Sequence, residues 1–314
     1  CVLTLDNNVG TINENDRINN AAAIDLRGGT LNYTGRAQTA STETLGAVTA
    51  DQGASTITVA TGGTGINSAE LTLTSLARTA ASGATLNVTG TNVGTIGSAP
   101  RVLITGQANT ASFAPWLIIN SGDYAAYSDG IGLGAIGQAG FPTYAAALTN
   151  GNNLPTNIST NTVDVALGAS GLDSTIGSLR FSGTTTRNIT FTNGTTTGGS
   201  EYLNLALGGL LHSNENGATN IGTTAARGIL TAGGAALSGN TELIAYNAQN
   251  TTTINSVIVD TFDPLATNAG SATVSFVKSG AGTLALTANN TYTGGTIVNQ
   301  GNLRLNGGVG VVTI

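Results

Sequence analysis

The 314-residue sequence is poor in the residues that build reactive or cross-linked sites. It has no methionine, one cysteine, one histidine and one lysine, and 8% of its residues are charged, against about a quarter in ordinary globular domains. A single cysteine excludes a framework of internal disulfide bonds, and a single histidine without partner cysteines excludes a histidine-rich zinc site. We therefore predict no metal and no cofactor.

The few charges are acidic in balance and scattered. The net charge is −6, and the nine arginines occur singly. Binding to nucleic acid requires clustered Lys and Arg to neutralise phosphates, so that role is disfavoured. No run approaches the roughly eighteen apolar residues of a membrane helix, so no transmembrane segment is expected. Hydrophobic residues still make up 40% of the chain, which is enough to bury a core and argues against disorder.

Glycine, threonine and asparagine dominate what remains, and their arrangement is clearest in residues 279–307. Short alternating runs of Leu, Val and Thr, at 283–286, 296–298 and 303–305, are separated there by Gly and Asn corners. A period of two predicts strands with one buried and one wet face, and corners this close leave no room for crossover helices. We expect an all-β chain wound as a β-solenoid.

Internal repeats support this expectation. Residues 29–35, GTLNYTG, and 83–90, GATLNVTG, share one frame, and looser copies occur at 228–233 and 282–287. Recurrence of one short unit is typical of stacked repeats. We predict coils of roughly 20 to 28 residues each.

One segment departs from the repeat rhythm and suggests a division of the chain. Residues 107–162 contain six of the fourteen aromatic residues, including the only tryptophan, and a Gly-dense run. We predict solenoid coils over 1–106, an elaborated flank insertion over 107–162, and further coils over 163–314. The insertion is the best candidate for a recognition surface, with candidate surface contacts at Trp116, Asp123, Tyr124, Tyr127 and Asp129.

Enzymatic chemistry has little support. Polysaccharide lyases and hydrolases use clustered carboxylates, whereas here only Asp123 and Asp129 approach a cluster, beside Tyr124 and Tyr127 that could stack on sugars. A carboxylate near a Gly turn more often accepts backbone N–H groups. We predict no catalytic residue and no enzyme. The alternatives are a polysaccharide-active β-helix, lyase or hydrolase, and a glycan-binding adhesin.

Three further residue patterns are interpreted without a functional site. Gly132, Gly134 and Gly137 match a dinucleotide-binding pattern, but Phe141 and Pro142 follow where a helix would be needed, so no nucleotide site is predicted. His212 follows a Gly pair and is expected at a wet corner. Cys1 is expected in the interior, since cysteine is usually buried; lipidation and an intermolecular disulfide are the alternatives.

The C-terminal strands also resemble a known family. Residues 278–287 read KSGAGTLALT, followed by NNTYTGGT from Asn289 and QGNL from Gln300. This order closely resembles the autotransporter-associated β-strand repeat of bacterial passenger regions. The resemblance implies a right-handed parallel β-helix that is secreted across the outer membrane and displayed outside the cell or at its surface. It implies no catalytic residues.

Both ends of the sequence lack the polar caps that isolated solenoids need. In related repeats a G-x-V-T-I strand is commonly followed by L-T-L-D-N, so residues 310–314 read as though they should run into residues 1–7. We expect head-to-tail stacking of copies or one period of a longer array, with stacking ends at Val2, Leu3, Leu5, Val311, Val312 and Ile314. The predicted function is a non-enzymatic, secreted structural β-solenoid of an extracellular fibre, sheath or adhesive surface layer, with surface glycans as further partners.

Overall fold

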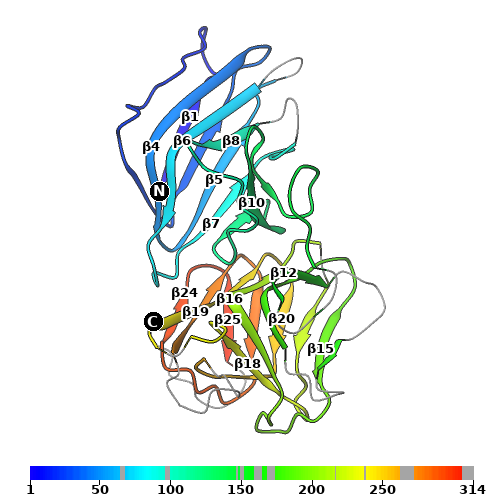
Figure 1. Ribbon diagram of the computed structural model, residues 1–314. Helices are drawn as coiled ribbons and strands as arrows, with labels where there is room; N and C mark the ends of the chain where they lie inside the picture. Colours follow the sequence, from blue (N-terminus) through cyan, green and yellow to red (C-terminus); the bar gives the residue numbers. More distant parts are fainter. Residues whose placement is uncertain are drawn as a thin grey trace. The chain divides into compact units, whose positions relative to one another are not determined.

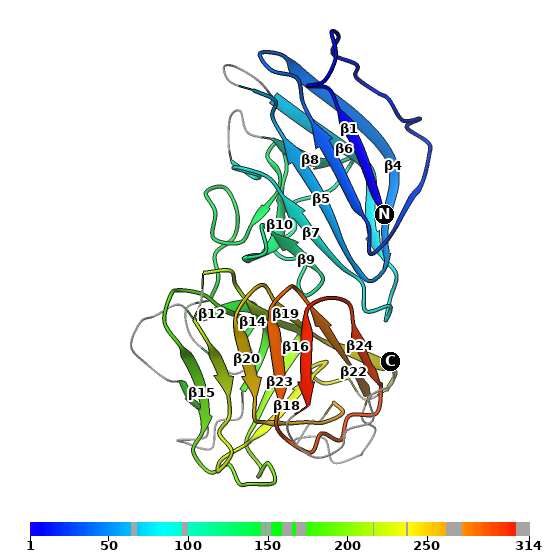
Figure 2. The ribbon, with the colours of Figure 1, turned by 180° about the vertical axis from the view of Figure 1, so that it is seen from behind.

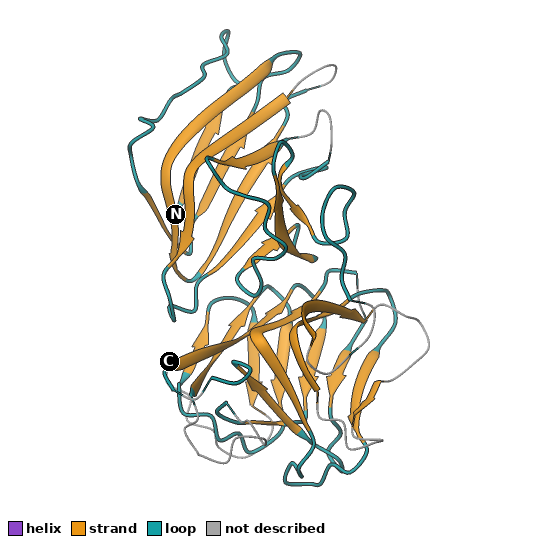
Figure 3. Cartoon of the chain, in the orientation of Figure 1, coloured by secondary structure: helices purple, strands orange, loops and turns teal. Residues whose placement is uncertain are grey.

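The computed structural model describes residues 1–63, 68–95, 100–145, 148, 152–158, 165–167, 174–215, 217–236, 238–261 and 272–305. These residues form strands joined by loops and turns, with no helix among them (Figure 3). Accordingly, no helix in this part of the chain is long and apolar enough to cross a membrane. The chain divides into two compact units, Cys1–Thr143 and Tyr144–Ile314. The all-β prediction is confirmed.

The first unit winds between two sheets (Figure 1). Among the first nine strands, the odd-numbered ones lie in one sheet and the even-numbered ones in the other. Within each sheet these strands pair in parallel. A chain that alternates between two parallel sheets is a solenoid. The first sheet contains β1 (Val2–Asp6), β3 (Thr30–Thr34), β5 (Ala54–Ala60), β7 (Thr85–Thr89), β9 (Leu117–Ile119), β10 (Asp123–Ser128) and β11 (Gly132–Ala135), and the second contains β2 (Ile24–Arg27), β4 (Ala40–Gln52), β6 (Ser68–Arg78) and β8 (Arg101–Ile104).

The parallel register stacks like residues on like. One inward column runs through Leu3, Leu31, Ile57, Val88 and Ile119, each paired with the next. All but the first are buried. The neighbouring outward column contains only Thr and Asn side chains. The period of two in the sequence thus separates an aliphatic interior from a hydroxyl- and amide-bearing exterior.

The first unit ends in an antiparallel closure. β10 pairs antiparallel with β9 and with β11, so the parallel ladder stops there. The hydroxyl of Tyr127, on β10, accepts a hydrogen bond from the Ile104 N–H (3.2 Å) and donates one to the Ile104 carbonyl (3.1 Å). One buried hydroxyl therefore satisfies backbone groups at the open edge of β8. We call residues 107–143 the cap segment.

Side-chain amides satisfy open backbone groups along the edge of β4. β2 pairs only with residues 48–52 of β4, so on that side the first half of β4 has no strand partner among the described residues. Asn13 donates its side-chain N–H to the Ala40 carbonyl (3.0 Å), and Asn15 accepts the Thr42 N–H (2.9 Å). The loop between β1 and β2 thus covers this edge without forming a strand.

The second unit is also built from alternating parallel strands (Figure 2). A short side ladder of β18 (Ile229–Ala232) and β21 (Val257–Ile258) branches from β16. The two main sheets are β12 (Asn152–Ile158), β14 (Ser174–Phe181), β16 (Tyr202–His212), β19 (Asn240–Asn247), β22 (Thr273–Ser279) and β24 (Thr296–Val298), and β13 (Val165–Leu167), β15 (Arg187–Phe191), β17 (Thr219–Ile221), β20 (Thr251–Ile254), β23 (Thr283–Leu286) and β25 (Asn302–Leu305).

This unit has its own aliphatic column, Ile189, Ile221, Ile254, Leu286 and Leu305. The first four are buried, whereas Leu305, on the last strand that the structure describes, is 50% exposed. Each unit therefore holds a separate hydrophobic core.

The sequence located the strands better than the coil length. The three runs expected within 279–307 are β23, β24 and β25. Coil lengths only partly match the predicted range: paired positions on β3 and β5 are 26 residues apart, within it, whereas Asn188 and Asn220, hydrogen-bonded between β15 and β17, are 32 residues apart, above it. Loops at the corners account for the excess. The right-handed winding and the flank insertion over 107–162 remain predictions; residue 162 lies outside the described residues.

Replacing Tyr127 by Phe should open the edge of β8. Two buried backbone groups of Ile104 lose their partner, so we expect the first unit to lose about 1–3 kcal/mol of unfolding free energy. Chemical denaturation, together with hydrogen exchange at the Ile104 amide, measures this loss.

Tyr33→Phe is the matched control, because Tyr33 is equally buried but its hydroxyl makes no hydrogen bond to a backbone group among the described residues. Equal destabilisation by the two substitutions would contradict the edge-closing role of Tyr127.

Candidate functional site

The five predicted surface contacts all lie in the cap segment, but they do not form one surface. Tyr124 and Tyr127 are only 1% and 4% exposed, so neither ring is available to stack on a sugar, and the prediction is wrong for them. Both rings serve the core of the cap. Trp116 is half-buried and packs edge-on against Phe113, with ring centroids 6.2 Å apart.

The two predicted carboxylates occupy opposite ends of one strand. Asp123 begins β10 and is half-buried, and Asp129 is exposed in the turn that follows Ser128. The part of the chain that the structure describes contains no group of three or more His, Cys, Asp or Glu side chains that could hold a metal ion. A surface contact through Trp116, Asp123 or Asp129 remains a prediction.

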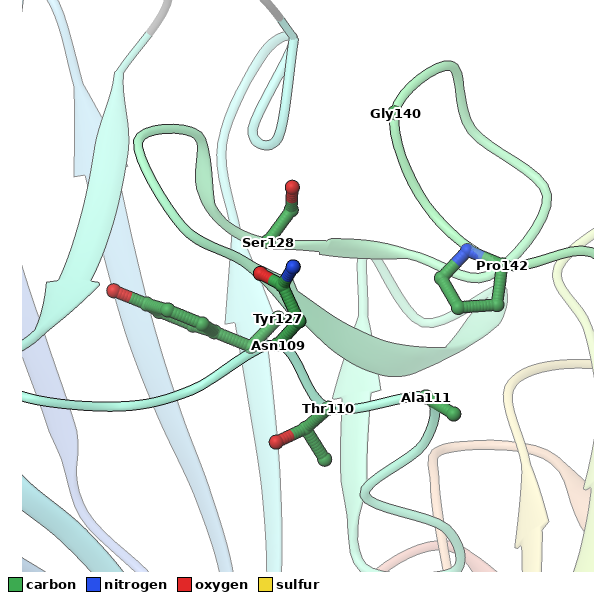
Figure 4. Close-up of a pocket in the computed structure, with 7 residues that line it drawn as sticks. All are labelled: Asn109, Thr110, Ala111, Tyr127, Ser128, Gly140 and Pro142. Carbon is green, nitrogen blue, oxygen red and sulfur yellow. The ribbon is translucent and has the colours of Figure 1, made fainter.

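A hollow of about 380 Å³ opens in the cap segment (Figure 4). Three pieces of chain line it: the loop after β8, the end of β10, and the loop after β11. The lining residues are Asn109, Thr110, Ala111, Tyr127, Ser128, Gly140 and Pro142. Of the predicted contacts, only Tyr127 belongs to the lining, and none of the lining side chains is charged. The hollow can hold a ligand but offers no acid, base or activated nucleophile.

The second unit contains a polar site that sequence reasoning missed. Lys278, the only lysine, is fully buried on β22 in an inward column, after Leu179, Leu210 and Ala245. Its Nζ donates to the carbonyls of Ser279 (2.7 Å), Gly280 (2.6 Å) and Gln300 (3.0 Å). Three acceptors match the three N–H groups of an ammonium. Burial lowers the pKa of Lys278 from 10.5 to about 8.

Glycines make room for this corner. A Cβ on Gly280 would lie 2.3 Å from the Asn247 carbonyl oxygen, and one on Gly282 would lie 2.5 Å from Asn247 Oδ1. A Cβ on Gly301 would lie 2.8 Å from Lys278 Nζ. The glycines of the KSGAG and QG motifs are therefore fixed by close packing against the preceding coil and against the buried lysine.

A carboxylate holds the next corner. Asp260 Oδ1 accepts the backbone N–H groups of Val274 and Thr293, both at 2.8 Å, and Oδ2 accepts the Thr293 hydroxyl at 2.7 Å. This aspartate binds the turn that contains the TYTGG motif. It acts as a backbone acceptor, as expected for carboxylates near Gly turns.

Two other expectations from the sequence are wrong. His212 is buried within β16 rather than at a wet corner, and its Nδ1 lies 2.6 Å from Thr252 Oγ1. The preceding Gly208 lies inside the same strand, where a Cβ would meet the Glu242 carbonyl oxygen at 1.8 Å, so the Gly pair does not mark a turn. Cys1 is exposed rather than interior.

The predicted stacking ends are only partly exposed, and half of them lie beyond the described residues. Val2 and Leu3 are exposed on β1 and Leu5 is buried. Val311, Val312 and Ile314 lie outside the described residues. On β25, Leu305 is exposed at the end of its column, a position that the sequence analysis did not select.

Comparison with known proteins identifies one segment. Residues 276–305 match the family model described as passenger-associated-transport-repeat. The match covers β23, β24, β25 and the corner built by Lys278, Gly280 and Gly301. It confirms the resemblance to an autotransporter-associated repeat there. No curated protein and no solved structure shows a significant match to the chain.

Gly280→Ala should destabilise the second unit by about 3 kcal/mol or more. Gly280 has φ +74°, and the added methyl would collide with the Asn247 backbone. Gly295→Ala is the control, since Gly295 has φ +87° but open space around it, and we expect it to cost only about 1–2 kcal/mol. Equal losses in chemical denaturation would show that backbone conformation alone explains the glycine.

The pH dependence of stability should reveal Lys278. Between about pH 8 and 10 the unfolded chain retains the lysine proton and the folded chain releases it, so the unfolding free energy rises with pH there. The slope should reach at most about 1.4 kcal/mol per pH unit. Burial raises the pKa of Tyr292, which makes the unfolding free energy fall with pH, but only above the ordinary tyrosine pKa of 10.0.

Denaturation of the native chain and of Lys278→Met between pH 7.5 and 9.5 tests this assignment. As the pH rises across this range, the unfolding free energy of the native chain should increase relative to that of Lys278→Met. Parallel pH profiles would contradict the assignment.

Proposed function

We propose that this chain is a non-enzymatic structural β-solenoid of an autotransporter passenger-type surface protein. It is secreted, winds as a right-handed parallel β-helix, and forms part of an extracellular fibre, sheath or adhesive layer. The observation that carries the proposal is the passenger-associated-transport-repeat at 276–305, stacked in register on the coils before it. The strands of the matched repeat continue the same parallel sheets as the coils before it.

The acidic residues support a structural role. Glu43 is buried and its carboxylate accepts the backbone N–H groups of Arg17 (2.8 Å) and Ile18 (2.9 Å). Glu201 is buried and accepts the Asn193 N–H at 2.9 Å. Together with Asp260, these carboxylates hold loops against coils. Groups committed to backbone N–H donors are poorly suited to proton transfer.

Each unit has an edge strand from which further coils can continue. The column through Leu31 and Ile57 ends at Leu3, 41% exposed, and the column through Ile254 and Leu286 ends at Leu305, 50% exposed. β1 carries Leu at positions 3 and 5, and β25 carries Leu at positions 303 and 305, with one polar residue between each pair. Two strands with the same L-x-L spacing can stack in a parallel register and continue both columns.

We therefore expect purified chains to associate end to end. Leu3→Asp and Leu305→Asp each place an unpaired charge at the end of an apolar column, so they should shorten or abolish filaments in electron micrographs and lower the mass measured by light scattering. Leu207→Asp is the control, because Leu207 is 43% exposed but lies on β16, in the middle of a sheet.

Dispersed monomers in the native preparation, or filaments unaffected by the two edge substitutions, would contradict assembly through these strands. Release of unsaturated or reducing sugars from acidic glycans would instead favour the polysaccharide-active alternative.

A further inference from the structure

We propose that the hollow in the cap segment binds a neutral sugar ring, such as a pyranose unit of an uncharged glycan. The site is distinct from the stacking edges, so the inference goes beyond the structural function proposed above. It is also distinct from the aromatic and carboxylate surface expected from the sequence, because the rings of Tyr124 and Tyr127 are buried.

The walls of the hollow are already held in place by hydrogen bonds within the protein. Thr110 and Tyr127 exchange both backbone hydrogen bonds at 3.0 Å, which fixes the loop after β8 against the end of β10. The Gly137 N–H donates to the Pro142 carbonyl at 2.7 Å and closes the opposite loop. A preformed site loses little conformational entropy when a ligand binds.

The buried side of the cap anchors that opposite loop. Phe141 is buried, and a Cβ on Gly134 would lie 2.3 Å from its ring, so glycine is required for the ring to seat on β11. Gln138 accepts the Ala135 N–H (3.1 Å) and donates to the Val93 carbonyl (3.0 Å). Pro142 is therefore presented by a loop that is held against β11 and against the turn after β7.

Two polar groups of the lining remain available to a ligand. Asn109 Oδ1 accepts the Asp129 N–H at 2.7 Å, which orients the amide and leaves its Nδ2 as a donor with no partner among the described residues. Ser128 Oγ has no hydrogen-bond partner among the described residues. Thr110 is different, because its hydroxyl already accepts from Gln107 Nε2 (2.8 Å) and donates to the Ala108 carbonyl (3.1 Å). A donor and a hydroxyl on one wall suit the hydroxyl groups of a sugar.

Apolar surface completes the site. Figure 4 shows Pro142 across the hollow from Asn109 and Ser128, with Ala111 between the two walls. A pyranose has a C–H face as well as a hydroxyl edge, and this lining offers a partner to each. The volume of about 380 Å³ is within the usual range for small-molecule sites.

Charge selects a neutral ligand over an acidic one. No lining residue carries a charge. The nearby Arg101 is committed to an ion pair with Glu70 and to the Gly130 carbonyl (3.0 Å). Asp129 is exposed beside the hollow and would repel an anion. A uronate, sialic acid or phosphate would therefore find no compensating cation.

Saturation-transfer difference NMR and calorimetry with the full chain test the proposal. The probes are methyl glycosides of neutral hexoses and of N-acetylhexosamines, compared with methyl glucuronide and N-acetylneuraminic acid. We expect at least one neutral glycoside to bind and both acidic sugars to bind at least tenfold more weakly.

Two substitutions locate the binding. Ser128→Ala should weaken it about fivefold by removing one hydrogen bond, and Ala111→Gln should weaken it more than tenfold because a neutral side chain then fills the hollow. Ser75→Ala and Ala77→Gln are the matched controls, since both residues are exposed on β6 and away from the lining. Thermal melts establish that each variant is folded.

Absence of binding by every neutral probe would overturn the proposal, as would equal or tighter binding of the acidic sugars. Binding that survives both Ser128→Ala and Ala111→Gln would also overturn it, because the sugar would then occupy another place. These outcomes are independent of filament formation, so the two proposals fail separately.

Discussion

Parallel stacking of one coil on the next is the constraint on which this structure depends. In the column Leu179, Leu210, Ala245 and Lys278 each residue faces the same position one coil away. A side chain is therefore confined by its neighbours above and below and not only by its own strand. Lys278 fits such a column because its stem lies among aliphatic residues and its ammonium reaches the carbonyls of the corner.

Polar side chains in both units mainly satisfy backbone groups that strand pairing leaves open. Tyr127 closes the edge of β8, Asn13 and Asn15 close half of β4, and Asp260 binds the corner around Thr293. Buried backbone groups without partners are costly, so polar side chains, charged or neutral, are placed at edges and corners where such groups occur. The cap hollow differs, since Asn109 uses only its Oδ1 on a backbone N–H, and its Nδ2 and Ser128 Oγ bond no backbone group among the described residues.

The sequence predicted the periodic part of the fold and missed what depends on contacts between coils. Alternation of Leu and Thr located β23, β24 and β25, because burial on one face is a local property of a strand. Lys278 and His212 were harder, since their partners, Gln300 and Thr252, lie in other coils. A lone lysine directly after Phe276 and Val277, in strand alternation, was the available signal. Tyr124 and Tyr127 suggested a binding surface, but they belong to the antiparallel closure, which has no repeat to reveal it.

The in-step register of β17 and β20 has an evolutionary consequence. Thr219 on β17 pairs with Thr252 on β20, and the following residues pair in step. Deletion of residues 220–252 would join Thr219 to Thr253 and Ile254, so that the strand would read T-T-I in place of T-N-I. One whole turn would be lost while the pattern of inward and outward positions survived. Unequal recombination can thus lengthen or shorten such a gene in steps of one turn, and each product retains a continuous core.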